Sequence, residues 1–185
     1  MDFYNQLLAQ TLSGGGGGGG DKYAAFKALV GDSLTEVTAE MLDGITVIRI
    51  NSFSNCKSLL SVTIPNSVRS IGNSAFYNCT SLTSVTIPYS VSSINSSLFS
   101  SCTSLSSITI PQTVSSISYS VFSGCTSLTS VTVESSRPPS LGTDVFNNTN
   151  QSLVIYVPSG SVENYKAARG WSTYADRIQA IPSGN

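Results

Sequence analysis

The four cysteines of this chain recur at one fixed spacing, and this spacing constrains the fold more than any other feature. They are Cys56, Cys79, Cys102 and Cys125, each 23 residues after the one before. A fixed period of this length is the signature of a repeat array. Apolar residues keep the same step, in the columns Phe53, Phe76, Phe99, Phe122; Leu59, Leu82, Leu105, Leu128; and Val62, Val85, Ile108, Val131. The chain is therefore expected to fold as a stack of similar coils.

Each repeat contains the segment Ser-Val-Thr-Ile or a close variant, and in three repeats proline follows it. Polar and apolar residues alternate in this segment, as in a half-buried strand. Proline then ends the strand, because it has no N–H group for a ladder hydrogen bond. The remaining segment, V-x-x-I-x-x-x-x-F, is expected to return the chain through short extended or 3₁₀ pieces. Crossovers between parallel strands favour a right-handed coil, so we expect a right-handed, mainly β repeat solenoid with helical caps.

Five segments are expected along the chain. Residues 1–13 would form a short helix or tail, and residues 14–20, which include a run of glycines, a flexible linker. Residues 21–50 would form an N-terminal cap, residues 51–133 the repeats, and residues 134–185 a last irregular turn and a C-terminal cap. Caps are needed because an uncovered apolar rung invites end-to-end association.

Local signals add detail to the N-terminal part. Asp21 is expected to cap a short helix over residues 22–29, and Ser33 with Glu36 fits a capping box by pattern. We favour instead a strand from Leu34 to Val37 that opens the solenoid. Thr38 would then cap a single turn that stops at Gly44.

At the C-terminal end, apolar residues recur at three- to four-residue steps from Val162 to Ile181. This spacing predicts an amphipathic closing segment, broken at Gly170. Trp171 is expected to plug the last rung rather than to bind sugar.

Composition argues against several classes of function. The chain has 9 Lys and Arg against 10 Asp and Glu, and it has no histidine. Near-zero net charge gives no long-range attraction for nucleic acid, and the missing histidine removes the commonest general base and metal ligand. We therefore expect no enzyme, no cofactor, no metal and no nucleic-acid partner. No apolar run is long enough for membrane insertion, and the N-terminus lacks the pattern of a secretory signal.

The cysteines allow more than one interpretation. Stacked rungs lie about 4.8 Å apart, which is within the Cα separation that a disulfide spans, so neighbouring cysteines could pair. We favour reduced, buried thiols in the apolar column, because each cysteine occupies the same repeat position. Zinc is disfavoured, because there is neither a C-x-x-C spacing nor a histidine.

The outward positions of the strands form the first candidate for partner binding. They make an uncharged lattice of hydroxyl groups: Ser61, Thr63, Ser84, Thr86, Ser107, Thr109, Ser130 and Thr132. This lattice is either a plain soluble face whose threonines favour strand, a docking face for a protein or glycan, or an ice-binding surface.

Residues that break the column pattern are the second candidate. Arg69, Tyr77, Tyr89 and Tyr119 each stand where the neighbouring repeats carry Ser, Asn or Gln. Exposed Tyr and Arg are favoured anchors in interfaces, although neutral drift on a solvated face would leave the same pattern. Glu134, in the irregular turn, has no evident partner in the sequence.

The repeat resembles the BspA-type (Treponema pallidum type) leucine-rich repeats of bacteria and some protists. The resemblance rests on residues 58–82 and their echoes down to Val133, on residues 35–53, and on RPPSLGTDVF and LVIYVP after the last repeat. It implies a leucine-rich-repeat solenoid with a role in adhesion or recognition at a cell surface, and it implies no catalytic residues.

The sequence thus favours a non-catalytic recognition protein that binds a protein or a surface glycan. The alternative is a structural spacer or a virion or surface-assembly component, tethered by its N-terminal segment. Residues 1–13, with an apolar stripe at helical spacing, are the candidate for self-association.

Overall fold

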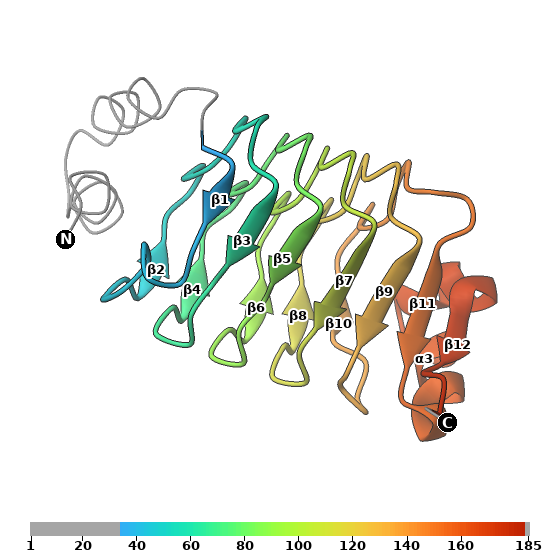
Figure 1. The fold of residues 1–185 in the computed structure, drawn as a ribbon. Coiled ribbons are helices and arrows are strands. Elements are labelled where there is room, and N and C mark those ends of the chain that lie inside the picture. The colour runs from blue at the N-terminus through green and yellow to red at the C-terminus, as the bar shows by residue number, and fades with distance from the viewer. Residues whose placement is uncertain (1–33, 184–185) are drawn as a thin grey trace.

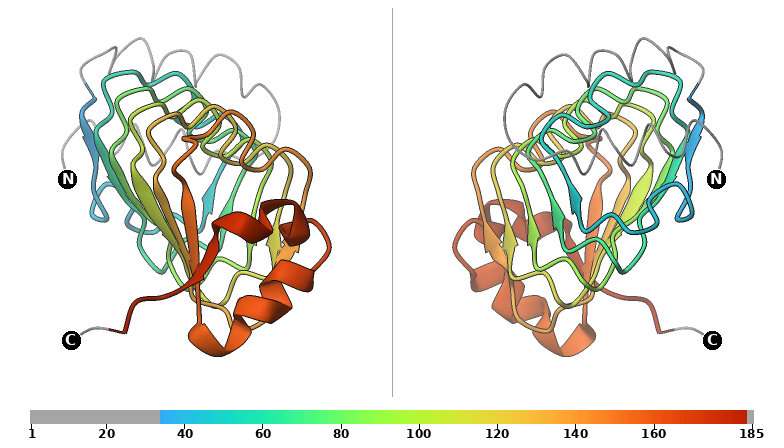
Figure 2. Two further views of the ribbon diagram at one scale, coloured as in Figure 1. Left: turned by 90° about the vertical axis from the view of Figure 1, so that its right-hand side faces the viewer. Right: turned by 90° about the vertical axis from the view of Figure 1, so that its left-hand side faces the viewer.

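The computed structural model describes residues 34–183, which form a stack of coils with the two ends of the stack far apart (Figure 1). The expected N-terminal helix or tail, the glycine linker, the helix at 22–29 and the capping box at Ser33 lie outside the described residues. Seen along the stack, successive coils superpose (Figure 2). The prediction of a mainly β repeat solenoid with parallel strands is confirmed, while the handedness of the coil and the five segment boundaries stay predictions.

The Ser-Val-Thr-Ile segments form one side of the coil. Its strands are β1 (Glu36–Val37), β3 (Ser61–Thr63), β5 (Ser84–Thr86), β7 (Ser107–Ile110), β9 (Ser130–Val133), β11 (Val154–Val157) and β12 (Ile178–Ala180). All pairings are parallel, and like residues face one another, as in Ser61 with Ser84 and Ser107 with Ser130. The ladder runs from β1 to β5 and again from β7 to β12, but β5 and β7 lie side by side without a ladder between them.

The return arc of each coil forms a second, more broken sheet behind the first (Figure 1). Its strands are β2 (Val47–Ile48), β4 (Ser70–Ile71), β6 (Ser93–Ile94), β8 (Ser116–Ile117) and β10 (Ser140–Leu141). The expected short extended pieces are therefore present in the arc. Each arc also contains left-handed residues at matching positions, such as Asn51, Ser74, Ser97, Ser120 and Asp144, all with φ between 54° and 59°. These residues turn the chain sharply within the arc.

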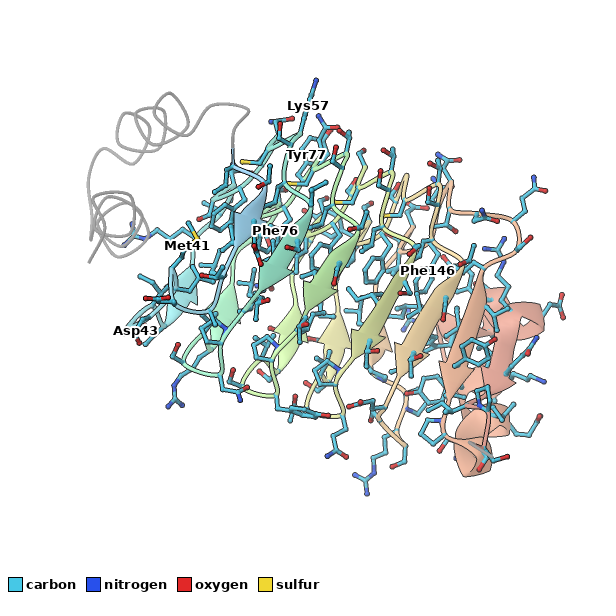
Figure 3. All side chains as sticks on the ribbon, in the orientation of Figure 1. Met41, Asp43, Lys57, Phe76, Tyr77 and Phe146 are labelled. Atoms are coloured by element: carbon cyan, nitrogen blue, oxygen red, sulfur yellow. The ribbon has the colours of Figure 1, made fainter. Side chains whose placement is uncertain are left out.

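The core of the coil is a column of stacked phenylalanine rings. Phe53, Phe76, Phe99, Phe122 and Phe146 are buried, and successive ring centroids lie 5.2, 5.7, 5.8 and 5.6 Å apart. Successive rings are tilted by only 2° to 8°, so each ring repeats the orientation of the last. Figure 3 shows Phe76 and Phe146 inside the coil, whereas Lys57 points away from it. The column runs through all the repeats and ties each coil to its neighbours.

The first coil begins as expected. The strand β1 pairs with β3, and the Thr38 hydroxyl accepts a 3.3 Å hydrogen bond from the Met41 N–H. The turn ends at Gly44, whose φ of 72° lies in the left-handed region that favours glycine. The predicted capped turn is confirmed, and the predicted strand is present but shorter than expected, because Leu34 and Thr35 lie outside β1.

The C-terminal segment closes the other end of the stack. It consists of the 3₁₀ helix η2 (Ser159–Ser161), the helix α3 (Val162–Ala167), the 3₁₀ helix η3 (Trp171–Arg177) and β12. Gly170, with φ of 86°, breaks the segment as expected. Trp171 is 1% exposed and its indole N–H donates to the Pro139 carbonyl at 2.7 Å, so it plugs the last rung. Within residues 34–183, no helix combines the length and apolar character that a membrane crossing requires.

Candidate binding surface

The alternation of the strands decides which side chains face outward. In β3 and β5 the valine is buried while the flanking Ser and Thr side chains are exposed or half-buried, and β7 and β9 repeat this order. The eight predicted Ser and Thr residues therefore stand on one outward face. We call this face, formed by the outward residues of β3, β5, β7 and β9, the hydroxyl face. The predicted lattice of hydroxyl groups is present on this face, and its role in binding stays a prediction.

The hydroxyl face is hollowed over the gap in the sheet. An open groove of about 490 Å³ runs across β5, β7 and β9, directly over the place where β5 and β7 form no ladder. Six of the predicted residues line it: Ser84, Thr86, Ser107, Thr109, Ser130 and Thr132. Ser61 and Thr63, on β3, lie beyond its edge. Among the described residues that line the groove, Glu134 is the one that carries a charge.

Tyr89 and Glu134 meet at one end of this groove. The Tyr89 hydroxyl donates a 3.0 Å hydrogen bond to Glu134 Oε2, although the two residues are 45 positions apart in the sequence. The expectation that Glu134 lacks a partner is therefore wrong. It failed because the contact spans two coils, and a residue-by-residue comparison of adjacent repeats does not detect such a pair.

The other pattern-breaking residues lie elsewhere. Tyr77 follows the buried Phe76, Arg69 precedes β4, and Tyr119 follows β8, so all three stand on the arc. None of them lines the groove. Figure 3 shows Tyr77 at the same margin of the coil as Lys57. Of the four predicted anchors, the structure brings only Tyr89 to the hydroxyl face.

Sequence reasoning missed Tyr156 on β11. It pairs with Thr132, and its neighbour Ile155 is buried, so Tyr156 continues the outward threonine column. The last coil is offset by one extra residue, because Val154 pairs with Ser130 at a separation of 24 rather than 23. A repeat search with a fixed step therefore leaves Tyr156 out of the column. Allowing one insertion would have found it.

The four cysteines are buried, and none of them forms a disulfide. Cys79, Cys102 and Cys125 each donate a 3.1 Å hydrogen bond to the carbonyl of the phenylalanine 26 residues earlier, in the preceding coil. Burial raises the pKa of Cys125 to about 12, which keeps this thiol protonated and unreactive at neutral pH. Among residues 34–183, no three Cys, Asp or Glu side chains converge as metal ligands would.

The sequence matches the model of a known repeat family. The model for the BspA-type leucine-rich-repeat region matches residues 25–164 with six copies of the repeat. This chain belongs to the BspA-type leucine-rich-repeat family. Leucine-rich-repeat proteins of this family are generally non-catalytic and typically bind other proteins. No curated protein matches the chain significantly.

Two solved structures share the leucine-rich-repeat fold of this BspA-type chain. A leucine-rich cell surface protein from Faecalibacterium prausnitzii A2-165 is 26% identical over 82% of this chain, with a TM-score of 0.60. The leucine-rich-repeat protein of T. pallidum is 30% identical over 71% of this chain, with a TM-score of 0.62. The chain spans 36% and 62% of the lengths of these two proteins, respectively.

Proposed function

We propose that this BspA-type protein is a non-catalytic recognition protein that binds its partner through the hydroxyl face, at a cell surface. The groove over β5, β7 and β9 is the observation that supports this proposal most directly. In this groove the outward Ser and Thr side chains line a depression in the surface, together with Tyr89, which departs from the repeat pattern. The cell-surface location rests on the description of the F. prausnitzii protein as a cell surface protein.

The chemistry of the face fits binding better than catalysis. Serine and threonine hydroxyls both donate and accept hydrogen bonds, but a serine nucleophile needs an adjacent base to activate it. Among the described residues that line the groove, Glu134 is the one ionisable carboxylate, and it already accepts the Tyr89 hydroxyl. A lattice of this kind can hold a partner by many weak hydrogen bonds while leaving it chemically unchanged.

A matched pair of arginine substitutions tests the face. Thr109→Arg places a long, charged side chain on the exposed centre of the hydroxyl face, while Ser70→Arg places the same side chain on an exposed strand position of the second sheet. Binding is measured by biolayer interferometry against immobilised extracellular-matrix proteins and by a glycan array. We expect a ligand whose affinity falls at least about tenfold in Thr109→Arg and stays unchanged in Ser70→Arg. Equal effects of the two substitutions, or no ligand in either format, would contradict the proposal.

The second candidate function is a structural spacer, favoured by the uninterrupted stacking of the phenylalanine column from Phe53 to Phe146. A stack tied together in this way resists bending. Deletion of residues 1–13 separates the two functions. A binding protein keeps its ligand affinity after the deletion, whereas a spacer tethered by that segment loses its incorporation into the assembly.

A further inference from the structure

Two departures from the repeat coincide at the end of the groove. Glu134 stands in the column that holds Pro65, Pro88 and Pro111 in the earlier repeats, and Tyr89 stands in the column of Asn66 and Gln112. Neither departure contributes to the core. Together they form the 3.0 Å hydrogen bond between side chains two coils apart. The Tyr89 side chain must therefore extend along the stack, across the coil that carries Pro111.

The hydrogen bond fixes an aromatic ring at the surface. Tyr89 remains 54% exposed, so its ring is open to solvent even though its hydroxyl is held. Hydrogen bonds to a carboxylate are the stronger ones, and this one raises the pKa of Tyr89, with the negative charge of Glu134 adding to the effect. The hydroxyl therefore stays protonated and keeps donating at neutral pH. A ring held in this way loses little freedom when a ligand covers it.

The floor beside this ring is polar and carries no cation. Hydroxyl groups of β5, β7 and β9 line it, and β5 and β7 form no backbone ladder beneath it. Its volume of about 490 Å³ falls within the range of roughly 300–1,000 Å³ that is typical of small-ligand sites. The aliphatic residues of the lining, Val85, Ile87 and Ile108, are themselves buried, so a strongly apolar ligand finds few partners here. Anionic ligands find no countercharge within the groove, and they meet the carboxylate of Glu134.

We propose that this groove binds a neutral oligosaccharide, with Tyr89 as the stacking platform and Glu134 as a hydrogen-bond acceptor. The inference rests on the proposed role of the hydroxyl face in binding. A sugar ring has an apolar face of C–H groups, which pack on an aromatic ring, and a rim of hydroxyls. Glu134 can accept bonds from that rim, and the Ser and Thr hydroxyls can both donate and accept. The uncharged ligand suits a groove whose one charge is already engaged by a protein side chain.

Tyrosine variants test the inference, with an exposed tyrosine outside the groove as the control. The full chain is titrated with neutral hexose and N-acetylhexosamine oligosaccharides of two to six units, and with sialylated and sulfated forms. We expect the neutral forms to bind better than the acidic ones. Tyr89→Ala should weaken binding about tenfold, from loss of the stacking platform. Tyr89→Phe keeps the ring but releases it from Glu134, so its affinity should lie between that of Tyr89→Ala and that of the wild type. The control, Tyr119→Ala, should bind with the affinity of the wild type.

The outcomes separate this inference from the proposed function. Absence of binding to every neutral oligosaccharide, or equal losses in Tyr89→Ala and Tyr119→Ala, would overturn the saccharide assignment. If a protein ligand binds, is lost in Thr109→Arg and is unaffected by Tyr89→Ala, the hydroxyl face remains the binding surface and only the saccharide assignment fails. If Thr109→Arg changes the affinity for no ligand, both the proposed role of the hydroxyl face and the saccharide assignment fail. Because Tyr89 and Tyr119 are both exposed, neither substitution removes core packing.

Discussion

In the middle of the coil each aromatic ring stacks on a copy of itself, whereas at the C-terminal end each ring has a different partner. Phe76, Phe99 and Phe122 lie nearly parallel. At the end of the column, Phe146 meets Trp171 at 51° and Tyr174 at 89°. A parallel stack can always accept one more ring, while tilted and edge-on rings offer no equivalent face. The change of geometry therefore both completes the core and terminates the array.

The two regions also satisfy their polar groups differently. In the middle, thiol and hydroxyl donors reach the carbonyl of the preceding coil, as Cys102 does to Phe76 and Thr129 to Ser106. At the end, the donors have partners of their own: Trp171 donates to Pro139, and the Tyr165 hydroxyl donates to Ser135 at 2.8 Å. The same kinds of hydrogen bond between neighbouring coils recur along the middle, whereas each hydrogen bond at the C-terminal end occurs once.

Truncating one aromatic ring in each region should have the largest effect on stability. We expect both Phe99→Ala and Trp171→Ala to lower the free energy of unfolding by about 3–5 kcal/mol, the range for large aromatic side chains in cores. Urea unfolding measures the loss. Hydrogen exchange should then differ, because coupling in a repeat array is between nearest neighbours. Phe99→Ala should raise exchange in the coils on both sides of residue 99, and Trp171→Ala only near the C-terminal end. Identical exchange patterns would contradict the distinction.

Substitutions at two glycines, one in each region, should have a smaller effect on stability. A Cβ at Gly142, in the coil, would lie 2.6 Å from the Tyr119 backbone nitrogen, whereas a Cβ at Gly160, in the cap, would meet nothing within 4 Å. Gly142→Ala should therefore force a backbone shift and cost about 1–3 kcal/mol, as overpacking does. Gly160→Ala should change stability by less than about 0.5 kcal/mol. Thermal denaturation of the two variants measures the difference, and similar values would show that the coils are not in close contact there.

At the N-terminal end of the repeats, one buried serine should be replaceable with a gain. Ser52 is 1% exposed and its hydroxyl has no hydrogen-bond partner, while later coils carry Ala75, Leu98 and Val121 in this column. Ser52→Ala removes the unsatisfied group and should stabilise the fold by about 1 kcal/mol. The control is Ser54→Ala, because the Ser54 hydroxyl accepts a 3.1 Å hydrogen bond from Asn55 and its loss should destabilise. Denaturant midpoints that move in the same direction for both would refute the explanation.

The regions also differ in how far the sequence could predict them. The period, together with the alternation of polar and apolar residues, predicted the main strands, the buried columns and the outward hydroxyls, because in the middle each strand residue pairs with its counterpart one period away. It could not predict the Tyr89–Glu134 contact, in which unlike residues meet across two coils. It also missed Tyr156, which the extra residue in the last coil shifts out of step. At the C-terminal end, the spacing of the apolar residues indicated a plug at Trp171 but not the carbonyl of Pro139 to which its indole donates.

The same contrast explains where recognition is expected. Most core columns repeat, as the phenylalanine column does, because each side chain packs on its copy in the next coil; the buried column of Ser52, Ala75, Leu98 and Val121 is an exception. Outward columns carry no such requirement, so a departure there costs little and can add a contact to a partner. Tyr89, Glu134 and Tyr156 are departures of this kind on or beside the hydroxyl face.

Hydrogen exchange with and without ligand tests the central claim most directly, that recognition occurs on the hydroxyl face while the rest of the coil supports it. The ligand is the oligosaccharide or matrix protein with the highest affinity in the binding measurements. The account predicts protection in β5, β7 and β9 and at Tyr89, with unchanged exchange in β4, β6 and β8. Protection confined to the second sheet or to the C-terminal cap would contradict it.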